Sequence, residues 1–101
     1  YKTTTAARDE FNNVSFGNSN GNDSWASAWS ESGDNSSPQS GAILVRQNDC
    51  PDSSSRCLEL NASGGLNDSA SRTINLSNAF SAVLSFDFHR RGGADNRDDF
   101  V

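Results

Sequence analysis

The chain has 101 residues, 33% of them hydrophobic, and its eight Lys and Arg against thirteen Asp and Glu give a net charge of −5. At about 100 to 150 residues per domain, this length allows one small domain or part of one and excludes a multi-domain enzyme. The negative charge disfavours nucleic-acid binding, and no apolar run approaches the roughly 20 residues of a membrane span, so membrane insertion is not expected. Eighteen Ser, twelve Asn, eight Gly and four Thr outnumber the core-forming residues. Because these small polar types favour turns over helix interiors, the composition is typical of an extracellular β protein.

The first stretch of the chain predicts extended backbone rather than helix. Residues 1–7, YKTTTAA, contain three consecutive Thr, which favour strands, so they are interpreted as an arm or a first strand. The chain starts at Tyr1 without Met or an apolar signal segment, which is typical of a mature or excised secreted segment. Residues 8–101 are expected to form one β domain, incomplete at its C-terminus. Within it, DSWASAWSE places Trp25 and Trp29 on one side of an extended segment.

Two strands are predicted in the middle of the chain, joined by a loop that carries both cysteines. GAILVRQ at 41–47 is a short apolar run, and RCLELNA at 56–62 alternates between two faces. A disulfide between Cys50 and Cys57 would close the hairpin loop and stabilise the fold by about 2.5 kcal/mol on the loop-entropy model. The alternative is a pair of reduced thiols or half of a metal site, but the chain has no other Cys and a single His. The disulfide predicts an oxidising, extracytoplasmic location.

The clearest strand pattern lies near the end of the chain. FSAVLSFDFH at 80–89 alternates with period two, which puts all three of its Phe with Ala82 and Leu84 on one face, expected to meet the core. SRTINLS at 71–77 is a further strand, with Ile74 and Leu76 on its inward side. In all, seven short strands without helices predict an all-β fold, an antiparallel β-sandwich or jelly roll.

A resemblance supports this architecture. NDSWASAWSESGDNSSPQSGAILV, then CLEL, then SRTINLSNAFSAVLSFDFHRRGGADNRDDFV follow one another in an order that resembles a jelly-roll module of large secreted bacterial cell-surface and adhesin-type proteins. The similarity covers nearly the whole chain, and the shape it implies is like that of MAM domains or carbohydrate-binding modules. It implies an extracellular structural or adhesive role and no reaction. Two departures are the cysteine pair and the stop at Val101, where the family continues with more strands.

The early stop predicts that something else completes the sandwich. Residues 98–101, DDFV, look like the beginning of a strand, so an apolar groove would need a cover. Residues beyond Val101 could supply it, or a strand from a neighbouring subunit by β-augmentation. Residues 1–7 have the β propensity for such a donor role, and a head-to-tail contact that does not close would propagate as a fibre. Alternatively, this arm is a linker or the domain's own first strand.

Oxygen donors gather in two loops that suit Ca²⁺, in NSNGNDS and in ADNRDD. Neither loop has the spacing of an EF-hand. The family resemblance implies one structural Ca²⁺, and the alternative is a set of solvated turn carboxylates. The candidate ligands are Asn20, Asn22, Asp23, Asp95, Asp98 and Asp99.

No catalytic residue is expected. His89, the single histidine, lies on the polar face at the end of the 80–89 strand, beside two arginines. No G-x-S-x-G elbow is present. Trp25 and Trp29 are candidate ligand-binding residues, since exposed aromatics stack on sugar faces. The alternative, favoured for at least one of them, is a core anchor in a domain poor in large apolar residues.

Six Asn-x-Ser sequons predict covalent glycans, about twice the number that this composition gives by chance. The alternative is that a sequence rich in Asn and Ser forms sequons freely. The sequons begin at Asn13, Asn22, Asn35, Asn61, Asn67 and Asn75.

Three functional classes follow from these patterns. The first, favoured here, is a subunit or repeat of a glycosylated extracellular fibre or adhesin, with copies of itself or neighbouring modules as partners. The second is a carbohydrate-binding or adhesion module that uses Trp25 and Trp29 to bind glycans. The third is an accessory domain of a secreted hydrolase with no activity of its own.

Overall fold

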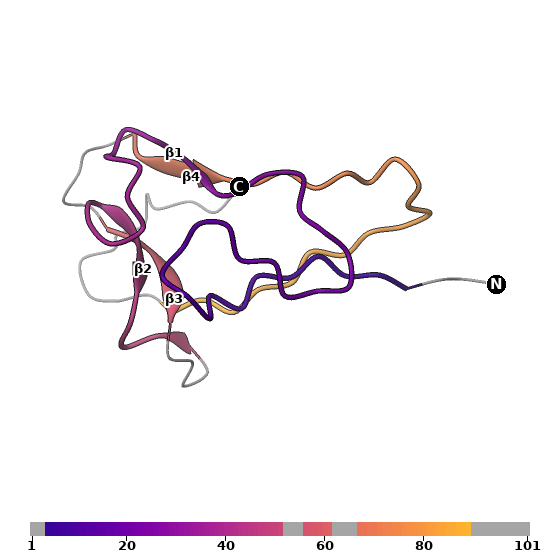
Figure 1. Cartoon of the computed structure of the whole chain (residues 1–101), viewed down its shortest axis with the longest axis horizontal. Coiled ribbons are helices and arrows are strands. Elements are labelled where there is room, and N and C mark those ends of the chain that lie inside the picture. Colours follow the sequence, from indigo (N-terminus) through magenta and orange to yellow (C-terminus); the bar gives the residue numbers. More distant parts are fainter. Residues whose placement is uncertain (1–3, 52–55, 62–66, 90–101) are drawn as a thin grey trace.

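The chain folds into short strands joined by long irregular segments. A computed structural model describes residues 4–51, 56–61 and 67–89, and these contain no α-helix, which confirms the all-β class. None of their elements is a helix long and apolar enough to cross a membrane. The four strands are β1 (Ser30–Ser32), β2 (Ile43–Arg46), β3 (Cys57–Leu60) and β4 (Ser69–Ser71) (Figure 1).

The strands form two separate two-stranded antiparallel sheets. In one, β1 pairs with β4, with Glu31 opposite Ala70. In the other, β2 pairs with β3 in a register that runs from Ile43 opposite Leu60 to Arg46 opposite Cys57. Both sheets lie toward one end of a molecule that measures 47 × 26 × 24 Å (Figure 1).

The predicted hairpin with its disulfide is confirmed. Cys50 and Cys57 are bonded, with Cα atoms 5.6 Å apart, within the usual span for a disulfide. The bond closes the connection between β2 and β3, and Arg46 bridges the hairpin by donating to Glu59 at 2.7 Å. This hydrogen bond raises the pKa of Arg46 above its usual value. The disulfide indicates an oxidising, extracellular environment.

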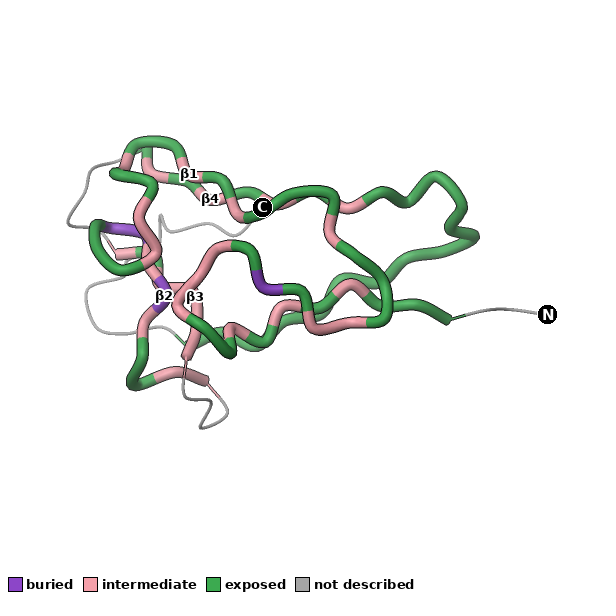
Figure 2. The backbone as a smooth tube through the Cα atoms, viewed as in Figure 1, coloured by how far each residue is buried: buried purple, intermediate pink, exposed green. Residues whose placement is uncertain are grey.

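The apolar core of the described residues is small and lies on β2. Ile43 is fully buried, and Ala42 and Val45 are nearly so. Along β2 the buried residues Ile43 and Val45 alternate with the half-buried Leu44 and Arg46, so one face of the strand carries the core. Figure 2 shows the buried positions at this strand and at Asn18 in the N-terminal segment, whereas most of the remaining tube is exposed.

Two glycines leave room for carboxylates in the loop between β1 and β2. Asp34 accepts a hydrogen bond from the backbone N–H of Ile43 at 2.8 Å, so its carboxylate lies over Gly41. A Cβ at Gly41 would collide with that carboxylate, and its φ of +106° disfavours any side chain. At Gly33, whose φ is +91°, a Cβ would likewise collide with the carboxylate of Asp68.

Several sequence-based expectations differ from the structure. Four strands form among the described residues, not seven, and the sandwich or jelly roll stays a prediction. The strand predicted at 71–77 is misplaced. The observed strand β4 ends at Ser71, and Leu76, expected to point inward, is exposed. The 80–89 segment lies outside both sheets, and its predicted core face is exposed. Alternation buries a face only where a second layer lies over it, and in the described part of the chain this face remains open.

Candidate functional site

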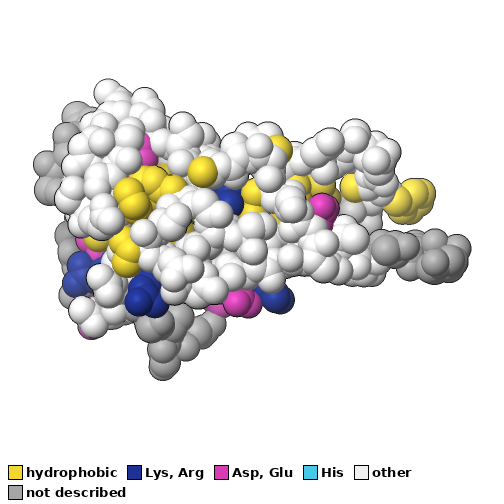
Figure 3. Space-filling model, in the orientation of Figure 1, with side chains coloured by type: hydrophobic (Ala, Val, Ile, Leu, Met, Phe, Trp, Pro, Cys, Tyr) yellow, Lys and Arg dark blue, Asp and Glu magenta, His cyan; other side chains and the backbone are white. Residues whose placement is uncertain are grey.

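The most distinctive surface of the protein is the exposed segment at residues 76–88, named here the apolar segment. Phe80 and Val83 are each 93% exposed and Leu84 is 80% exposed. Phe86 and Phe88 are more than half exposed, and Leu76 is close to that level. Apolar side chains are visible at the surface along much of one face in Figure 3. Large exposed apolar patches mark sites of interaction with other proteins, membranes or ligands, so the apolar segment is the candidate site.

Two aromatic rings lie close together at the end of the apolar segment. The ring centroids of Phe86 and Phe88 are 6.4 Å apart, with their planes tilted by 50°. Both residues are more than half exposed and belong to neither sheet.

A buried ion pair anchors the chain where it leads into the apolar segment. The side chains of Arg72 and Asp9 are 3% and 4% exposed and meet at 2.5 Å between Nη1 and Oδ2. The same Asp9 oxygen accepts the indole N–H of Trp29 at 2.9 Å, and Asp9 Oδ1 accepts the backbone N–H of Phe11 at 2.9 Å. Both oxygens are thus satisfied, which a carboxylate removed from water requires.

Arg72 also binds the N-terminal half of the molecule through the rest of its guanidinium group. It donates to the backbone oxygens of Asn18 at 2.7 Å and Ser27 at 2.9 Å, and it lies 4.7 Å from the centre of the Trp25 ring. Burial lowers the pKa of Arg72 from its usual value, and Asp9 opposes that shift. The guanidinium stays charged at neutral pH and holds four separate groups together.

Sequence reasoning did not foresee this polar cluster of Asp9, Asn18, Trp25, Trp29 and Arg72. Its two charged members are 63 positions apart, and no local pattern pairs them. The placement of both Trp in one cluster agrees with their expected position on one side of the chain.

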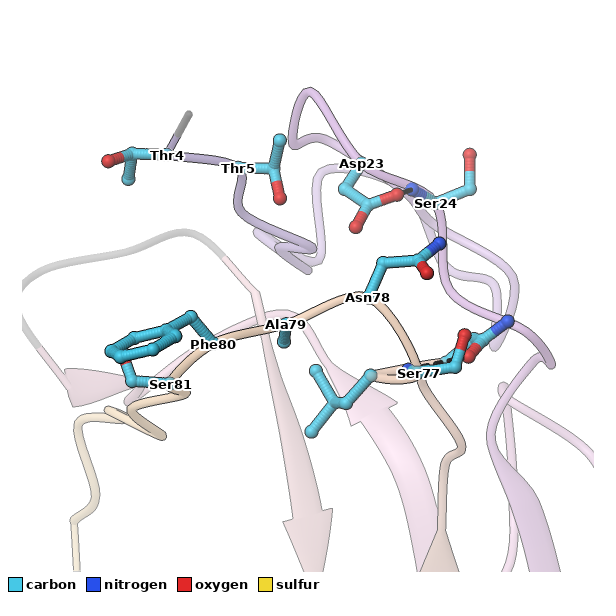
Figure 4. A pocket seen from close by; sticks show the side chains of 11 residues that line it. Thr4, Thr5, Asp23, Ser24, Ser77, Asn78, Ala79, Phe80 and Ser81 are labelled. Atoms are coloured by element: carbon cyan, nitrogen blue, oxygen red, sulfur yellow. Dashed lines mark hydrogen bonds between the residues drawn. The ribbon is translucent and has the colours of Figure 1, made fainter. Parts of the chain in front are cut away.

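A shallow hollow lies between the apolar segment and the N-terminal segment. Thr4, Thr5, Asp23 and Ser24 line one side and residues 75–81 line the other (Figure 4). In Figure 4, Asn78 points toward Asp23 and Ser24. The lining is almost entirely neutral and small, so it offers neither a nucleophile with a base nor a set of metal ligands. The described part of the predicted arm, residues 4–7, thus lies against its own chain, and Asp23 donates its N–H to Ala6 at 3.1 Å.

Both candidate ligand-binding tryptophans are half-buried and occupied within the protein. The guanidinium of Arg72 covers the Trp25 ring, and Trp29 stacks on Phe11 with centroids 6.5 Å apart. Each ring therefore already has a contact within the protein. The geometry therefore favours the interpretation of both as anchors of the polar cluster.

The candidate calcium ligands fall in two places. The side-chain oxygens of Asn20, Asn22 and Asp23 each accept a backbone N–H, from Glu10, Ala6 and Ser24 respectively. Asn20 and Asn22 thus hold the N-terminal segment, whereas Asp23 bonds to its own neighbour. Asp95, Asp98 and Asp99 lie outside the described residues. Within the described ranges, no group of three or more His, Cys, Asp or Glu side chains is placed to hold a metal ion.

The sequons differ in exposure. Asn61 is half-buried and the other five are exposed. The side-chain oxygens of Asn35 and Asn75 accept the backbone N–H of the serine two residues later at 2.9 Å, so both sequons form compact turns. His89 is exposed at the end of the apolar segment.

Comparison of the chain with protein-family models, with curated proteins and with solved structures gives no significant match.

Proposed function

We propose that this protein is a non-catalytic extracellular structural module, a subunit or repeat of a surface fibre or adhesin that assembles through β-strand contacts. The observation that carries the proposal is the exposure of Phe80, Val83 and Leu84 in the apolar segment. Three large apolar side chains within five residues cost free energy in water, and an added strand would remove them from it. The resemblance to jelly-roll modules of bacterial surface proteins points to the same role.

Two further features fit a surface assembly. The disulfide suits an oxidising environment outside the cell. Five exposed sequons would present glycans to solvent if they are modified, and a structural Ca²⁺ held by the acidic loops remains part of the proposal. Neither feature requires a reaction.

The experiment is to measure the mass of the purified chain over a range of concentrations by size-exclusion chromatography with light scattering, and to image it by electron microscopy. We expect dimers or larger assemblies to increase with concentration. The double variant Leu84→Ser with Phe86→Ser should remain monomeric, because it removes two exposed apolar side chains. Ser81→Thr with Ser85→Thr is the matched control, since it changes the opposite face of the same segment. A wild-type chain that stays a monodisperse monomer at every concentration would refute the assembly role.

The second candidate is a carbohydrate-binding module that uses Trp25 and Trp29. One observation favours it, namely that both Trp residues are partly exposed. Glycan-array binding that disappears in Trp25→Ala but persists in Leu84→Ser would favour this second function over assembly.

A further inference from the structure

One dipeptide in the N-terminal segment joins a labile side chain to an unhindered neighbour. The chain has twelve Asn, and among them only Asn20 is followed by Gly. Asn is one of the thermolabile residues of proteins. The backbone nitrogen of the next residue can attack the Asn side-chain amide, and Gly21 hinders this attack least because it has no Cβ. Among the Asn of this chain, Asn20 is therefore the one whose neighbour best permits loss of the amide.

The hydrogen bonds around Asn20 favour the same reaction. Its side-chain Oδ1 accepts the backbone N–H of Glu10 at 2.9 Å. Attack on the amide carbon places negative charge on this oxygen, and an N–H directed at it stabilises that charge. The backbone N–H of Asn20 donates to the oxygen of Arg8 at 2.8 Å, which keeps the residue in this position. In the described part of the chain, the N–H of Gly21 donates no hydrogen bond, so no acceptor holds the attacking nitrogen.

We propose that Asn20 is a site of spontaneous deamidation that loosens the N-terminal segment. The backbone nitrogen of Gly21 gives up its proton and bonds to Cγ of Asn20, and the side-chain nitrogen takes up a proton and leaves as ammonia. One water molecule then opens the resulting succinimide ring. Water that breaks the new bond gives aspartate, and water that breaks the original peptide bond gives isoaspartate. The net reaction consumes one water and releases one ammonia, so it needs no enzyme and no oxidant.

Isoaspartate does not fit at this position. Its main chain passes through the former side-chain carbons, which lengthens the chain before Gly21 by one carbon–carbon bond of about 1.5 Å. Gly21 packs closely against Ala6, since a Cβ on Gly21 would collide with the carbonyl oxygen of Ala6. The longer main chain displaces Gly21 from this close approach.

The same loop holds residues 4–7 against the rest of the chain. Asn22 Oδ1 accepts the backbone N–H of Ala6 at 2.7 Å, and the backbone N–H of Asp23 donates to the oxygen of Ala6 at 3.1 Å. Both bonds lie within three residues of the altered linkage, so its distortion releases residues 4–7. Deamidation is irreversible, and the released fraction therefore grows with the age of the protein. This site is separate from the apolar segment, and the proposal goes beyond the assembly function without depending on it.

The first experiment incubates the purified full chain at mildly alkaline pH and follows each Asn by peptide mapping with mass spectrometry. We expect Asn20 to react at least about tenfold faster than Asn22 and Asn35, which are followed by Asp and Ser. Fragmentation by electron transfer identifies isoaspartate at this position. A rate at Asn20 no higher than that at Asn22 or Asn35 would overturn the proposal. Reaction of Asn20 only after unfolding in urea would also overturn it, because the fold would then protect the site.

A second experiment separates the longer main chain from the added charge, using hydrogen exchange over residues 4–7. We expect exchange there to rise by at least about tenfold in the aged chain, because the segment opens locally. Asn20→Asp carries the same charge on a normal main chain and should exchange like the fresh wild type. Asn20→Gln is the matched control that should age without change, since its ring closure is slower. Circular dichroism confirms that both variants fold.

Two results of the exchange experiment would contradict the release of residues 4–7. If the aged chain contains isoaspartate at residue 20 but keeps the protection of residues 4–7, deamidation does not loosen the segment. If Asn20→Asp exchanges as fast as the aged chain, the charge and not the longer main chain opens it, and the role of isoaspartate is wrong.

Discussion

The polar cluster buries charged side chains, whereas the apolar segment exposes large apolar ones. Asp9 and Arg72 carry full charges and are 4% and 3% exposed, while Phe80 and Val83 are both 93% exposed. The two regions are neighbours in sequence, since Phe80 lies eight positions after Arg72. The comparison teaches that the hydrophobicity of a side chain alone does not decide in this chain whether it is buried.

The polar cluster is buried because its members satisfy one another. Arg72 has an acidic partner, two backbone oxygens and an aromatic ring, and Asp9 has three donors. Burying an ion without such partners costs several kcal/mol. The side chains of the apolar segment could be buried only against another apolar surface. In the described part of the chain, Phe80, Val83 and Leu84 are largely exposed.

Removal of the buried cation should have the largest effect. In Arg72→Met the Asp9 carboxylate stays buried without its counter-charge, so we expect the free energy of unfolding to fall by about 3 to 5 kcal/mol. Urea unfolding followed by Trp fluorescence measures this. Arg8→Met is the control, because Arg8 pairs with Glu10 on the surface and its loss should cost less than about 1 kcal/mol. Equal urea midpoints for the two variants would show that the polar cluster contributes no special stability.

Truncation of the apolar core should rank next. Ile43 is fully buried, so Ile43→Ala should destabilise the protein by about 3 kcal/mol through lost transfer energy and a cavity. Thermal unfolding checks the value. If Ile43→Ala were as stable as the wild type, the small core on β2 would not be a source of stability.

Removal of the disulfide should cost slightly less. Cys50→Ser with Cys57→Ser frees the loop between β2 and β3 in the unfolded chain, and we expect a loss of about 2.5 kcal/mol. Unfolding of the wild type with and without reductant is an independent measurement of the same quantity. A discrepancy between the two experiments would reveal an effect of the serine side chains themselves.

The smallest effect is expected in the apolar segment. Because Val83 is 93% exposed, Val83→Ser should change the stability of the monomer by no more than about 0.5 kcal/mol. The measurement must be made at a concentration at which the chain is monomeric. A loss comparable to that of Ile43→Ala would mean that the segment is buried in solution, and the contrast between the two regions would disappear.

The sequence predicted local features well and long-range ones poorly. The strands β2 and β3, their hairpin and the disulfide all lie within residues 41–62, where apolar runs and loop composition carry the information. The absence of helix from the described residues also follows from composition. These features depend on neighbours in the chain, so a single sequence is sufficient.

Other features depend on which distant segment lies nearby. Period-two alternation at 80–89 reports that a strand would have one apolar face, but not that another layer covers it, and here the face is exposed. The pairing of Asp9 with Arg72 joins residues with no shared local pattern. The turn glycines Gly33 and Gly41 fall between these cases, because their spacing reads as a turn but not as room for the Asp68 and Asp34 carboxylates.

The 63-residue separation between Asp9 and Arg72 also orders events in time. Loop closure over such a distance costs more entropy than closure of the β2–β3 hairpin, so the hairpin should form early and the ion pair late. A contact made after the folding barrier affects escape from the native state rather than entry to it. Asp9→Asn should therefore speed unfolding by about a hundredfold, if it costs about 3 kcal/mol, and leave the refolding rate nearly unchanged. The ion pair would then act as a kinetic latch that keeps the N-terminal half of the molecule closed.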